Sequence, residues 1–532
     1  MSFSFTAGDS LTLVALLAAA AALLATAEAT LIPYPIALVV GGLALSLVPG
    51  VPHIELAPDL VLVAVLPPLL YGTAFFTSLR ELRANARPIG LLAVGLVLTT
   101  MLAVAAVAHA AIPGLSWSGA FVLGAIVSPT DPTAATAIAR RLGLPRRLIS
   151  VIEGESLVND GTALVAYRFA VAAVVTGSFS LAEASGRFVL NVAGGIAIGL
   201  AVGFVLRQVR RRLDNPPLEL TISLLSGYFA YLPAQAAGVS GVLAAVTVGI
   251  YMGWHTPELT SPQVRLQGIA LWEIVFFVLN ALLFGLVGLQ LPAIVDALSG
   301  RSTGMLIRDA VVVTLAVMAA RFAWVFALGY LPRLLSRRIR ERDPVPSWRS
   351  KTILAWSGMR GAVSLAAALA LPLTTHAGGR FPDRALLIFL TCAVILGTLV
   401  VQGLTLPLLI RGVALEDDGL AQREEAKARI HAADAALERL EELVDEDWVR
   451  EDTAERMRGL YNFRRARFLP RVDSEADGSA EERSLDYQRL RRELLDAERR
   501  AVVELRQIGR IDDDVMRRVV RDLDLEDQRL DV

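Results

Sequence analysis

Long apolar runs fill most of the first 411 positions of this chain, and short polar loops separate them. Most runs are about 17–25 residues long, the length that an α-helix needs to cross the hydrocarbon core of a bilayer. The pattern therefore predicts an all-α, polytopic membrane protein with about thirteen transmembrane helices. The expected spans are residues 10–31, 34–49, 57–77, 88–111, 117–139, 147–175, 186–207, 217–234, 238–254, 268–291, 304–331, 350–372 and 384–411.

The loops between these runs differ in charge. Arginines gather in alternate loops, those after the third, fifth, seventh, ninth and eleventh spans, whereas the other loops, such as TGSFSLAEASGR and AGVSG, are nearly free of positive charge. Basic loops stay on the cytoplasmic side of a membrane. We therefore expect a multi-pass protein of the inner (plasma) membrane with its N-terminus outside and its C-terminus in the cytoplasm. The first run lacks the basic flank of a cleaved signal peptide and is predicted to be a retained span.

The pattern changes after position 411. Residues 1–411 hold 28 basic and 19 acidic side chains, whereas residues 412–532 hold 23 and 33. The second part reads as soluble, mixed-charge helix near residues 415–444, 450–468, 484–509 and 512–524. We predict a transmembrane exchange domain over 1–411 and a cytoplasmic, acidic, helical tail over 412–532 with a regulatory role.

Few residues suggest other chemistry. Cys392 is the single cysteine, which excludes disulfides within the chain and cysteine-based metal sites. The motif HIELAPD at 53–59 matches no metal-ligand spacing. The tail carries no catalytic motif. We therefore expect neither an enzyme nor a cofactor, and no nucleic acid as partner.

Residues 128–168 place ionisable and amide side chains at membrane depth: Asp131, Glu155, Asn159 and Asp160. A carboxylate there costs roughly 2.5–3.5 kcal/mol on insertion scales. Such a group normally faces protein or a watery cavity and marks an ion or proton path. This stretch is the candidate functional site.

The motif SPTDP predicts a break in the fifth span. Pro129 and Pro132 bracket Thr130 and Asp131, and prolines remove helix hydrogen bonds and clash with the preceding turn. Backbone freed in this way persists at membrane depth only where it lines a cavity or contacts a bound ion.

Helical spacing brings more oxygen atoms toward that break. Ser156 and Asp160 lie four residues apart and share a face, and so do Glu155 and Asn159. A carboxylate, a hydroxyl and freed backbone oxygens suit a partly dehydrated alkali cation or, alternatively, a proton. The candidate ligands are Asp160, Ser156, Thr130 and Asp131, with Asp160, Ser156 and Thr130 as ligands of Na+ or a similar ion.

Plainer explanations stay open for two of these residues. For Asp160 with Asn159, the alternative to an ion site is a structural hydrogen bond between helices. Asp131 either ligates the ion directly or caps the half-helix that follows the break and offsets its dipole.

The twelfth span contains WSGMRGAVSLAAALALP, in which Gly358 and Gly361 flank Arg360. Each glycine weakens a helix by roughly 1 kcal/mol, which allows a second interruption. A buried arginine needs an anionic partner, and Glu155 is the partner we predict. Arg321 is also embedded, and Asn280 and Gln290 are polar residues with which it could pair.

Three motifs, SPTDP, GESLVNDG and WSGMRGAVSLA, together with LPPLLY at 66–71, resemble those of bacterial NhaP-type monovalent cation:proton antiporters, relatives of the sodium/hydrogen exchangers. The likeness covers roughly residues 10–411. It implies inverted repeats, two crossed broken helices, a homodimer, and movement of a core domain against a dimerisation domain.

The resemblance also implies roles for single residues. Asp160 is the cation and proton carrier and Asn159 its neighbour, an Asn-Asp pair that is associated with electroneutral exchange. Glu155 pairs with Arg360. Many relatives carry a glutamate after LPPLLF, where this chain has Gly72, so ion selectivity is expected to differ.

The leading hypothesis is exchange of Na+, with Li+ or K+ as further candidates, for H+ in pH and cation homeostasis. A cation-coupled symporter of an organic solute on the same broken-helix fold is the alternative. A membrane sensor that signals through the tail is a third, which no kinase, nucleotide-binding or cyclase motif supports.

Overall fold

The computed structural model describes residues 34–46, 61–177, 181–335, 347–376, 378–413, 419–473 and 479–528. These residues are helical apart from their loops and one isolated bridge between Thr374 and Arg380. The chain divides into two compact units, residues 1–416 and 417–532. The boundary expected from the sequence, at 411 and 412, lies just before this division.

The helices of the first unit follow the apolar runs. They are α2 (Tyr34–Ser46), η1 (Val61–Val65), α4 (Leu66–Phe76), α5 (Leu79–Ala84), α6 (Ala86–Gly90), η2 (Leu91–Leu96), α7 (Val97–Ala111), α8 (Trp117–Ile126), α9 (Thr133–Arg141), α10 (Arg146–Thr176), α11 (Leu181–Arg210), α12 (Pro216–Ala236), α13 (Gly241–Leu259), α14 (Pro262–Asp296), α15 (Thr303–Leu335), α17 (Trp348–Trp356), α18 (Ala362–Leu369), α19 (Arg384–Thr398), η3 (Leu399–Gly403) and α20 (Leu404–Val413).

From the second span onward, each predicted span coincides over its described residues with a helix, a bent helix or two half-helices. The first, residues 10–31, lies outside the described residues, so the count of thirteen stays a prediction. Within the described ranges, six helices are long and apolar enough to cross a membrane. They are Ala86–Ala111, Arg146–Thr176, Phe188–Arg210, Pro262–Asp296, Thr303–Leu328 and Arg384–Val413.

Side-chain caps explain where several helices begin. Ser116 accepts a hydrogen bond from the backbone N–H of Gly119 at the start of α8, and Ser240 accepts one from Leu243 at the start of α13. Asn215 and Ser261 do the same for α12 and α14, each of which then begins with proline. These are the residue types that best satisfy the free N–H groups of a first turn.

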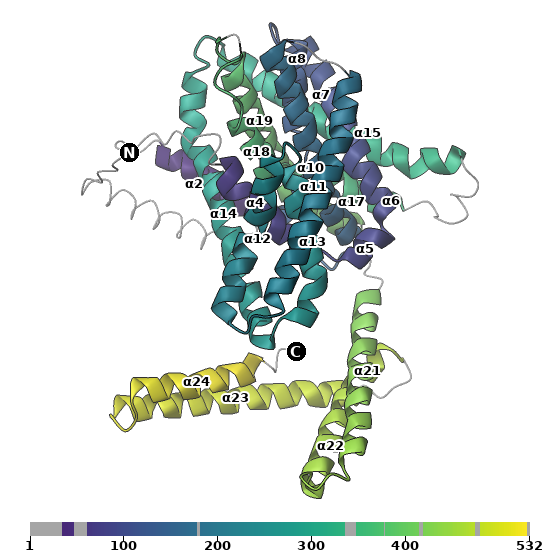
Figure 1. Cartoon of the computed structure of the whole chain (residues 1–532), viewed down its shortest axis with the longest axis vertical. Coiled ribbons are helices and arrows are strands. Elements are labelled where there is room, and N and C mark those ends of the chain that lie inside the picture. The colour runs from purple at the N-terminus through teal and green to yellow at the C-terminus, as the bar shows by residue number, and fades with distance from the viewer. Residues whose placement is uncertain are drawn as a thin grey trace. The chain divides into compact units, whose positions relative to one another are not determined.

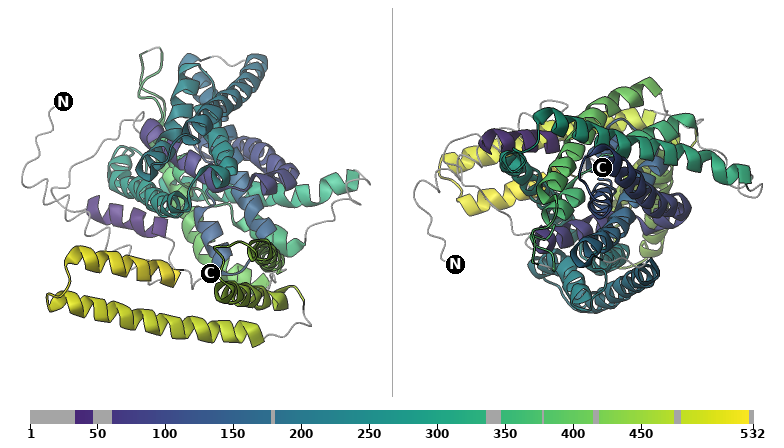
Figure 2. Two further views of the ribbon diagram at one scale, coloured as in Figure 1. Left: turned by 60° about the horizontal axis from the view of Figure 1, so that its bottom comes forward. Right: turned by 90° about the horizontal axis from the view of Figure 1, so that it is seen from above.

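The helices of the first unit pack in two groups, and Figures 1 and 2 show their arrangement. The first group is α4, α11, α12 and α13, and the second is α7, α8, α10, α15, α17, α18 and α19. α14 lies along α2 and contacts α4 and α12 of the first group and α18 and α19 of the second. The boundary between the two groups therefore runs past α4, α10, α14 and α18.

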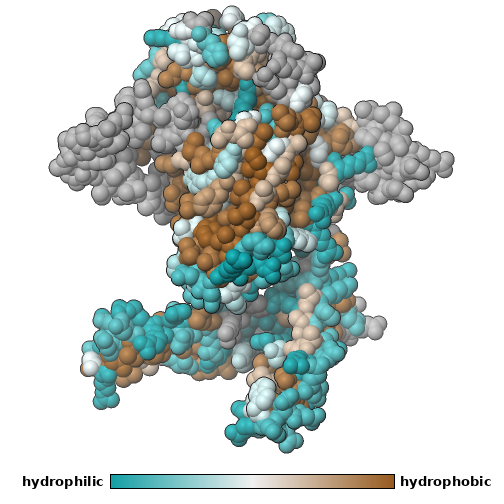
Figure 3. Space-filling view, in the orientation of Figure 1, coloured by the Kyte–Doolittle hydropathy of each residue, from teal (hydrophilic) through white to brown (hydrophobic). Residues whose placement is uncertain are grey.

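Apolar side chains also cover the outer surface of this unit. Figure 3 shows hydrophobic residues over the face that α11, α12 and α13 form, with hydrophilic residues at its lower end. Phe204, Val205, Phe229 and Leu232 are exposed there. Exposed apolar residues in this number are what a helix surface presents to lipid.

The second unit consists of two helical hairpins. α21 (Leu420–Leu443) packs on α22 (Glu451–Phe468), which ends in η4 (Leu469–Arg471), and α23 (Ser479–Gln507) packs on α24 (Asp513–Gln528). Ion pairs join the second hairpin: Arg499 contacts Asp524 at 3.0 Å and Asp527 at 2.8 Å. Arg506 donates a hydrogen bond to Asp513 and lowers the pKa of that carboxyl.

Candidate ion-binding site

The fifth span is broken at SPTDP. α8 ends at Ile126 and α9 begins at Thr133, with Pro129 and Pro132 in the segment between them. The second break lies at 357–361, between α17 and α18, where Gly358 and Gly361 stand. Both interruptions predicted from the sequence are therefore present.

The two breaks contact each other directly. The backbone N–H of Asp131 donates to the carbonyl of Met359 at 2.8 Å, and Arg360 Nη1 donates to the carbonyl of Ser128. A Cβ at Gly361 would overlap the carboxylate of Asp131. The glycine is thus required by close packing of the two breaks as well as by the interruption of the helix.

Asp131 uses its carboxylate to cap two half-helices at once. Oδ1 accepts from the N–H of Thr133 at 2.9 Å, at the start of α9, and Oδ2 accepts from the N–H of Ala362 at 3.3 Å, at the start of α18. Capping was one of the two explanations left open by the sequence. A carboxylate between two helix N-termini also offsets both dipoles.

Thr130 joins the first break to α10. Its carbonyl accepts from Ser156 Oγ at 2.7 Å, its hydroxyl oxygen accepts from Asn159 Nδ2 at 2.7 Å, and the hydroxyl donates to Glu155 Oε1 at 3.1 Å. The structure thus brings four of the predicted site residues into one hydrogen-bonded cluster. The oxygens of Ser156 and Thr130 are already bonded to each other, with lone pairs left for a further contact.

Asp160 lies one helical turn after Ser156, and its hydrogen bonding differs from that of Ser156 and Thr130. Its side chain is 7% exposed, and its buried Oδ1 has no hydrogen-bond partner among the residues that the structure describes. An isolated carboxylate is costly to bury in its charged form, so the site favours a bound cation or a bound proton.

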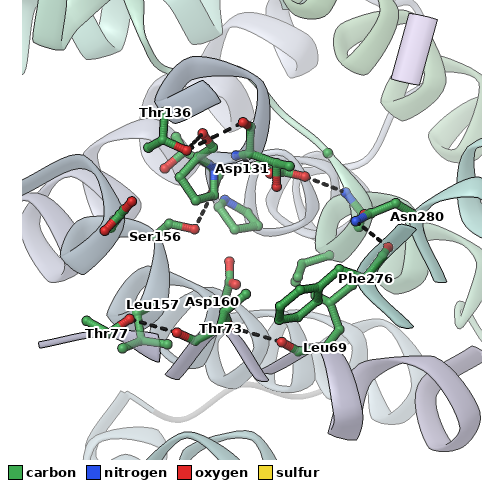
Figure 4. A pocket seen from close by; sticks show the side chains of 18 of the residues that line it. Leu69, Thr73, Thr77, Asp131, Thr136, Ser156, Leu157, Asp160, Phe276 and Asn280 are labelled. Atoms are coloured by element: carbon green, nitrogen blue, oxygen red, sulfur yellow. Dashed lines mark hydrogen bonds between the residues drawn. The ribbon is translucent and has the colours of Figure 1, made fainter. Parts of the chain in front are cut away.

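Asp160 faces a cavity of about 410 Å³ at the boundary between the two helix groups. Figure 4 shows the carboxylate of Asp160 between Ser156 on one side and Phe276 on the other. The wall includes Thr73 of α4, Asn280 of α14, and Asp131 and Gly361 of the two breaks. Within the described part of the chain, no group of three or more His, Cys, Asp and Glu side chains could hold a metal ion.

The predicted pairing of Glu155 with Arg360 is wrong. Glu155 is instead paired with Arg321 of α15, at 2.5 Å from Nη1 to Oε1 and 2.9 Å from Nη2 to Oε2. Arg321 also donates to the carbonyl of Leu354 in the last turn of α17. The bidentate pair thereby fastens α10, α15 and α17 together, and both side chains are 1% exposed.

Arg360 has a different environment. It is 0% exposed, Nη1 contacts the break in the fifth span, and Nε and Nη2 find no hydrogen-bond partner among the described residues. The sequence contained the signal for the correct pair, because Arg321 is a lone charge in an apolar run. Spacing along the chain could not decide which of two buried arginines faces Glu155.

Two residues of the α4–α14 wall were not assigned to the site from the sequence. Thr73 and Asn280 both line the cavity, and Asn280 donates to the carbonyl of Phe276 at 2.8 Å. Gly72, which replaces a glutamate of many relatives, packs instead on the rings of Trp272 and Phe276, where a Cβ would overlap. A carboxylate could not be added at position 72 without displacing these rings.

Comparisons with known proteins place the chain among cation transporters. The sequence model described as sodium/hydrogen exchanger, transmembrane, matches residues 13–412. An uncharacterised Na+/H+ exchanger of Mycobacterium tuberculosis (strain ATCC 25618 / H37Rv) is 38% identical over 500 residues, which are 93% of this chain and 91% of that protein. A sodium, potassium, lithium and rubidium/H+ antiporter of Bacillus subtilis (strain 168) is 36% identical over 388 residues, 71% of this chain and 58% of that protein.

The fold is similar to a solved structure. The sodium proton antiporter MjNhaP1 from Methanocaldococcus jannaschii superimposes with a TM-score of 0.60 at 18% identity, covering 77% of this chain and 100% of that one. At this identity the likeness concerns the fold alone, and it agrees with the all-helical architecture described above.

Proposed function

This chain belongs to the sodium/hydrogen exchanger family, and from that premise we propose that it exchanges Na+ for H+ across a membrane as a secondary antiporter. Li+ and K+ are further candidate cations, because the Bacillus relative is described as an antiporter of sodium, potassium, lithium and rubidium. The protein is a transporter and not an enzyme, and it acts on transported ions without a cofactor.

The observation that carries this proposal is the buried carboxylate of Asp160 at the cavity, whose Oδ1 has no hydrogen-bond partner in the part of the chain that the structure describes. One carboxylate holds either one proton or one monovalent cation, and each neutralises it. If the site changes its accessibility across the membrane only when it is neutral, it must carry a cation in one direction and return with a proton in the other. This coupling moves no net charge, so the exchange is electroneutral.

The residues around Asp160 take supporting roles in this proposal. Ser156, Thr130 and Asp131 contribute oxygen atoms to the cation or to water around it. Asn159 is a neutral neighbour that fixes the hydroxyl of Thr130 through its amide, so it adds no second charge to the site. Glu155 with Arg321 holds α10 in position.

We place the moving boundary between the two helix groups, since the cavity lies there. The second group, with both broken helices, would move as the core against α4 and α11–α13, and the first group would form a homodimer. The membrane is proposed to be the plasma membrane, with the N-terminus outside, the C-terminal tail in the cytoplasm, and pH and cation homeostasis as the role.

The comparisons do not support the alternative of a cation-coupled symporter for an organic solute. The relatives described above carry the names of exchangers and antiporters.

Everted membrane vesicles test the proposal. Adding Na+, Li+ or K+ should dissipate an imposed proton gradient, and Asp160→Asn should abolish the response because an amide neither takes up a proton nor neutralises a cation. Glu273→Gln is the matched control, since this carboxylate lies exposed on α14 within an apolar span and does not line the cavity. The control should keep exchange near the parent rate.

The same vesicles report on shared-site competition. Raising the proton concentration should raise the apparent Michaelis constant for the cation with little loss of maximal rate. An apparent constant that does not change over about two pH units, or exchange by Asp160→Asn near the parent rate, would move the carrier role away from Asp160.

A further inference from the structure

The ion cavity carries an ion pair to which the proposed exchange assigns no role. Arg140 and Glu153 both line the cavity, and Arg140 Nη2 lies 2.7 Å from Glu153 Oε1. The side chain of Arg140 is 64% exposed and that of Glu153 is 28% exposed, so the pair lies where the cavity meets solvent. It joins α9, the second half of the broken fifth span, to α10.

The pair continues two rows of side chains that lead to the ion site. Glu153, Ser156 and Asp160 follow one another on α10 at intervals of three and four residues, share a face of that helix and line the cavity. A row with the same spacing lines the cavity from α9, made of Thr133, Thr136 and Arg140. Seven residues of helix span about 10 Å, so Glu153 is about 10 Å from Asp160 along the axis of α10.

The charges in the cavity single out this pair. Among the described residues that line it, the charged side chains are Asp131, Arg140, Glu153 and Asp160. Asp131 accepts two backbone N–H groups, and Asp160 is the proposed carrier. Glu153 is therefore the carboxylate that a cation meets first at this mouth, and the guanidinium of Arg140 already occupies it.

We propose that Glu153 is an entry site for the transported cation and that Arg140 is a tethered competitor for it. This inference rests on the proposed exchange and adds a second station to its path. A cation can displace Arg140 because exposed ion pairs are weak. The cation then passes the hydroxyl groups of the two rows to Asp160, and Arg140 returns to Glu153 and keeps a second cation out.

An ion pair that only held α9 against α10 would behave differently. Removing either charge would then act in the same direction, through loss of stability. An entry site and its competitor act on cation binding in opposite directions, because one attracts the cation and the other excludes it. The signs of the two effects therefore separate the proposed role from a structural one.

The test measures the apparent Michaelis constant for Na+ in everted vesicles, at an ionic strength held constant with choline chloride. Glu153→Gln should raise this constant and Arg140→Gln should lower it. Each shift should be up to about fivefold, because an exposed ion pair contributes at most about 1 kcal/mol and each 1.4 kcal/mol is about tenfold. The maximal rate should change little, since Asp160 is intact in both variants.

Two controls remove the same charges elsewhere. Arg141→Gln changes the next residue of α9, and Glu273→Gln changes a carboxylate of α14. Both side chains are exposed and lie outside the lining of the cavity, so both controls should keep the constant of the parent.

The double variant of Arg140→Gln with Glu153→Gln shows whether Arg140 acts through Glu153. Without the carboxylate the guanidinium has nothing to compete for, so the double variant should match Glu153→Gln alone. A double variant with the constant of the parent would mean that only the net charge at the mouth matters, and would overturn the entry site.

Purified full-length protein gives a readout that does not depend on transport. The unfolding temperature is followed against the concentration of Na+, Li+ or K+, and the concentration for half-maximal stabilisation should rise in Glu153→Gln and fall in Arg140→Gln. If the parent exchanges but the variants shift in the same direction or not at all, the entry site is wrong and the exchange stands. If the expected shifts occur without exchange in the parent, the entry site stands and the exchange is wrong. A parent that no cation stabilises and that exchanges none would overturn both.

Discussion

Two aspartates in one cavity have opposite environments. Both oxygens of Asp131 accept backbone N–H groups, whereas Oδ1 of Asp160 has no partner among the described residues. The sequence identified both as candidate ligands, because a carboxylate between apolar residues is visible in any sequence. It could not distinguish them, because the N–H of Ala362 comes from a segment more than two hundred positions away.

A sequence does not show which distant segments come into contact, and this also explains why Glu155 was predicted to pair with the wrong arginine. Glu155 needed a buried partner, and both Arg321 and Arg360 were available in apolar runs. Only the packing of α15 on α17 turns Arg321 toward Glu155.

The Glu155–Arg321 pair should behave as a unit. Glu155→Gln or Arg321→Met leaves one buried charge unpaired, at a cost of about 3–5 kcal/mol in the free energy of unfolding. The double variant should cost less than the sum of the singles, because no charge remains unpaired. Denaturant or thermal unfolding in detergent measures these differences.

The double variant of Arg360→Met with Glu155→Gln serves as the comparison for the Glu155 and Arg321 variants. Arg360 bonds to the carbonyl of Ser128 and not to Glu155, so these two changes should be closer to additive. Strong coupling of Glu155 to Arg360 and none to Arg321 would reverse the assignment.

The broken helices are the elements that the sequence described best. Paired prolines at 129 and 132 and paired glycines at 358 and 361 have local effects on the backbone, and local effects can be read from a sequence. The sequence could not indicate that the breaks touch or that Gly72 packs on aromatic rings of α14. Those are facts of packing between distant segments.

Removing the double cap should destabilise the protein. Asp131→Ala frees two helix N-termini, at roughly 0.5–2 kcal/mol each, so the unfolding temperature in detergent should fall. Asp131→Asn keeps one acceptor and should lie between the alanine variant and the parent.

Asp160→Ala is the matched control for the cap. It removes a buried carboxylate whose Oδ1 makes no hydrogen bond to the described residues, so it should lose exchange without losing stability. If Asp131→Ala unfolds no more readily than Asp160→Ala, the hydrogen bonds of Asp131 do not stabilise the breaks.

At the scale of the whole molecule, hydropathy predicted the positions of the spans and the change from apolar spans to charged helices near residue 411. It could not predict which helices pack in which group, since every span is apolar on more than one side. The two parts of the chain also carry opposite net charges, −10 for residues 412–532 and +9 for the first 411 residues. We therefore expect the acidic tail to act on exchange through electrostatic attraction.

Truncation after Arg411 should leave exchange measurable and shift its dependence on pH or salt. Every candidate site residue precedes position 411, and attraction between exposed charges weakens with salt over a Debye length of about 8–10 Å. Full-length and truncated protein in liposomes, assayed over a salt and pH series, provide the measurement. A truncated protein that remains an intact dimer yet transports nothing would mean that the tail completes the transport machinery.

The carboxylate of Asp131 binds α9 and α18 to each other through backbone groups, independently of any ion in the cavity. A hinge cannot open between these half-helices without breaking that tie. Spin labels on α9 and α18 should accordingly give one narrow distance distribution with or without Na+, at high and at low pH. Labels on α4 and α18 should give distributions that change with the ion, and the contrast would identify the two broken helices as one rigid body.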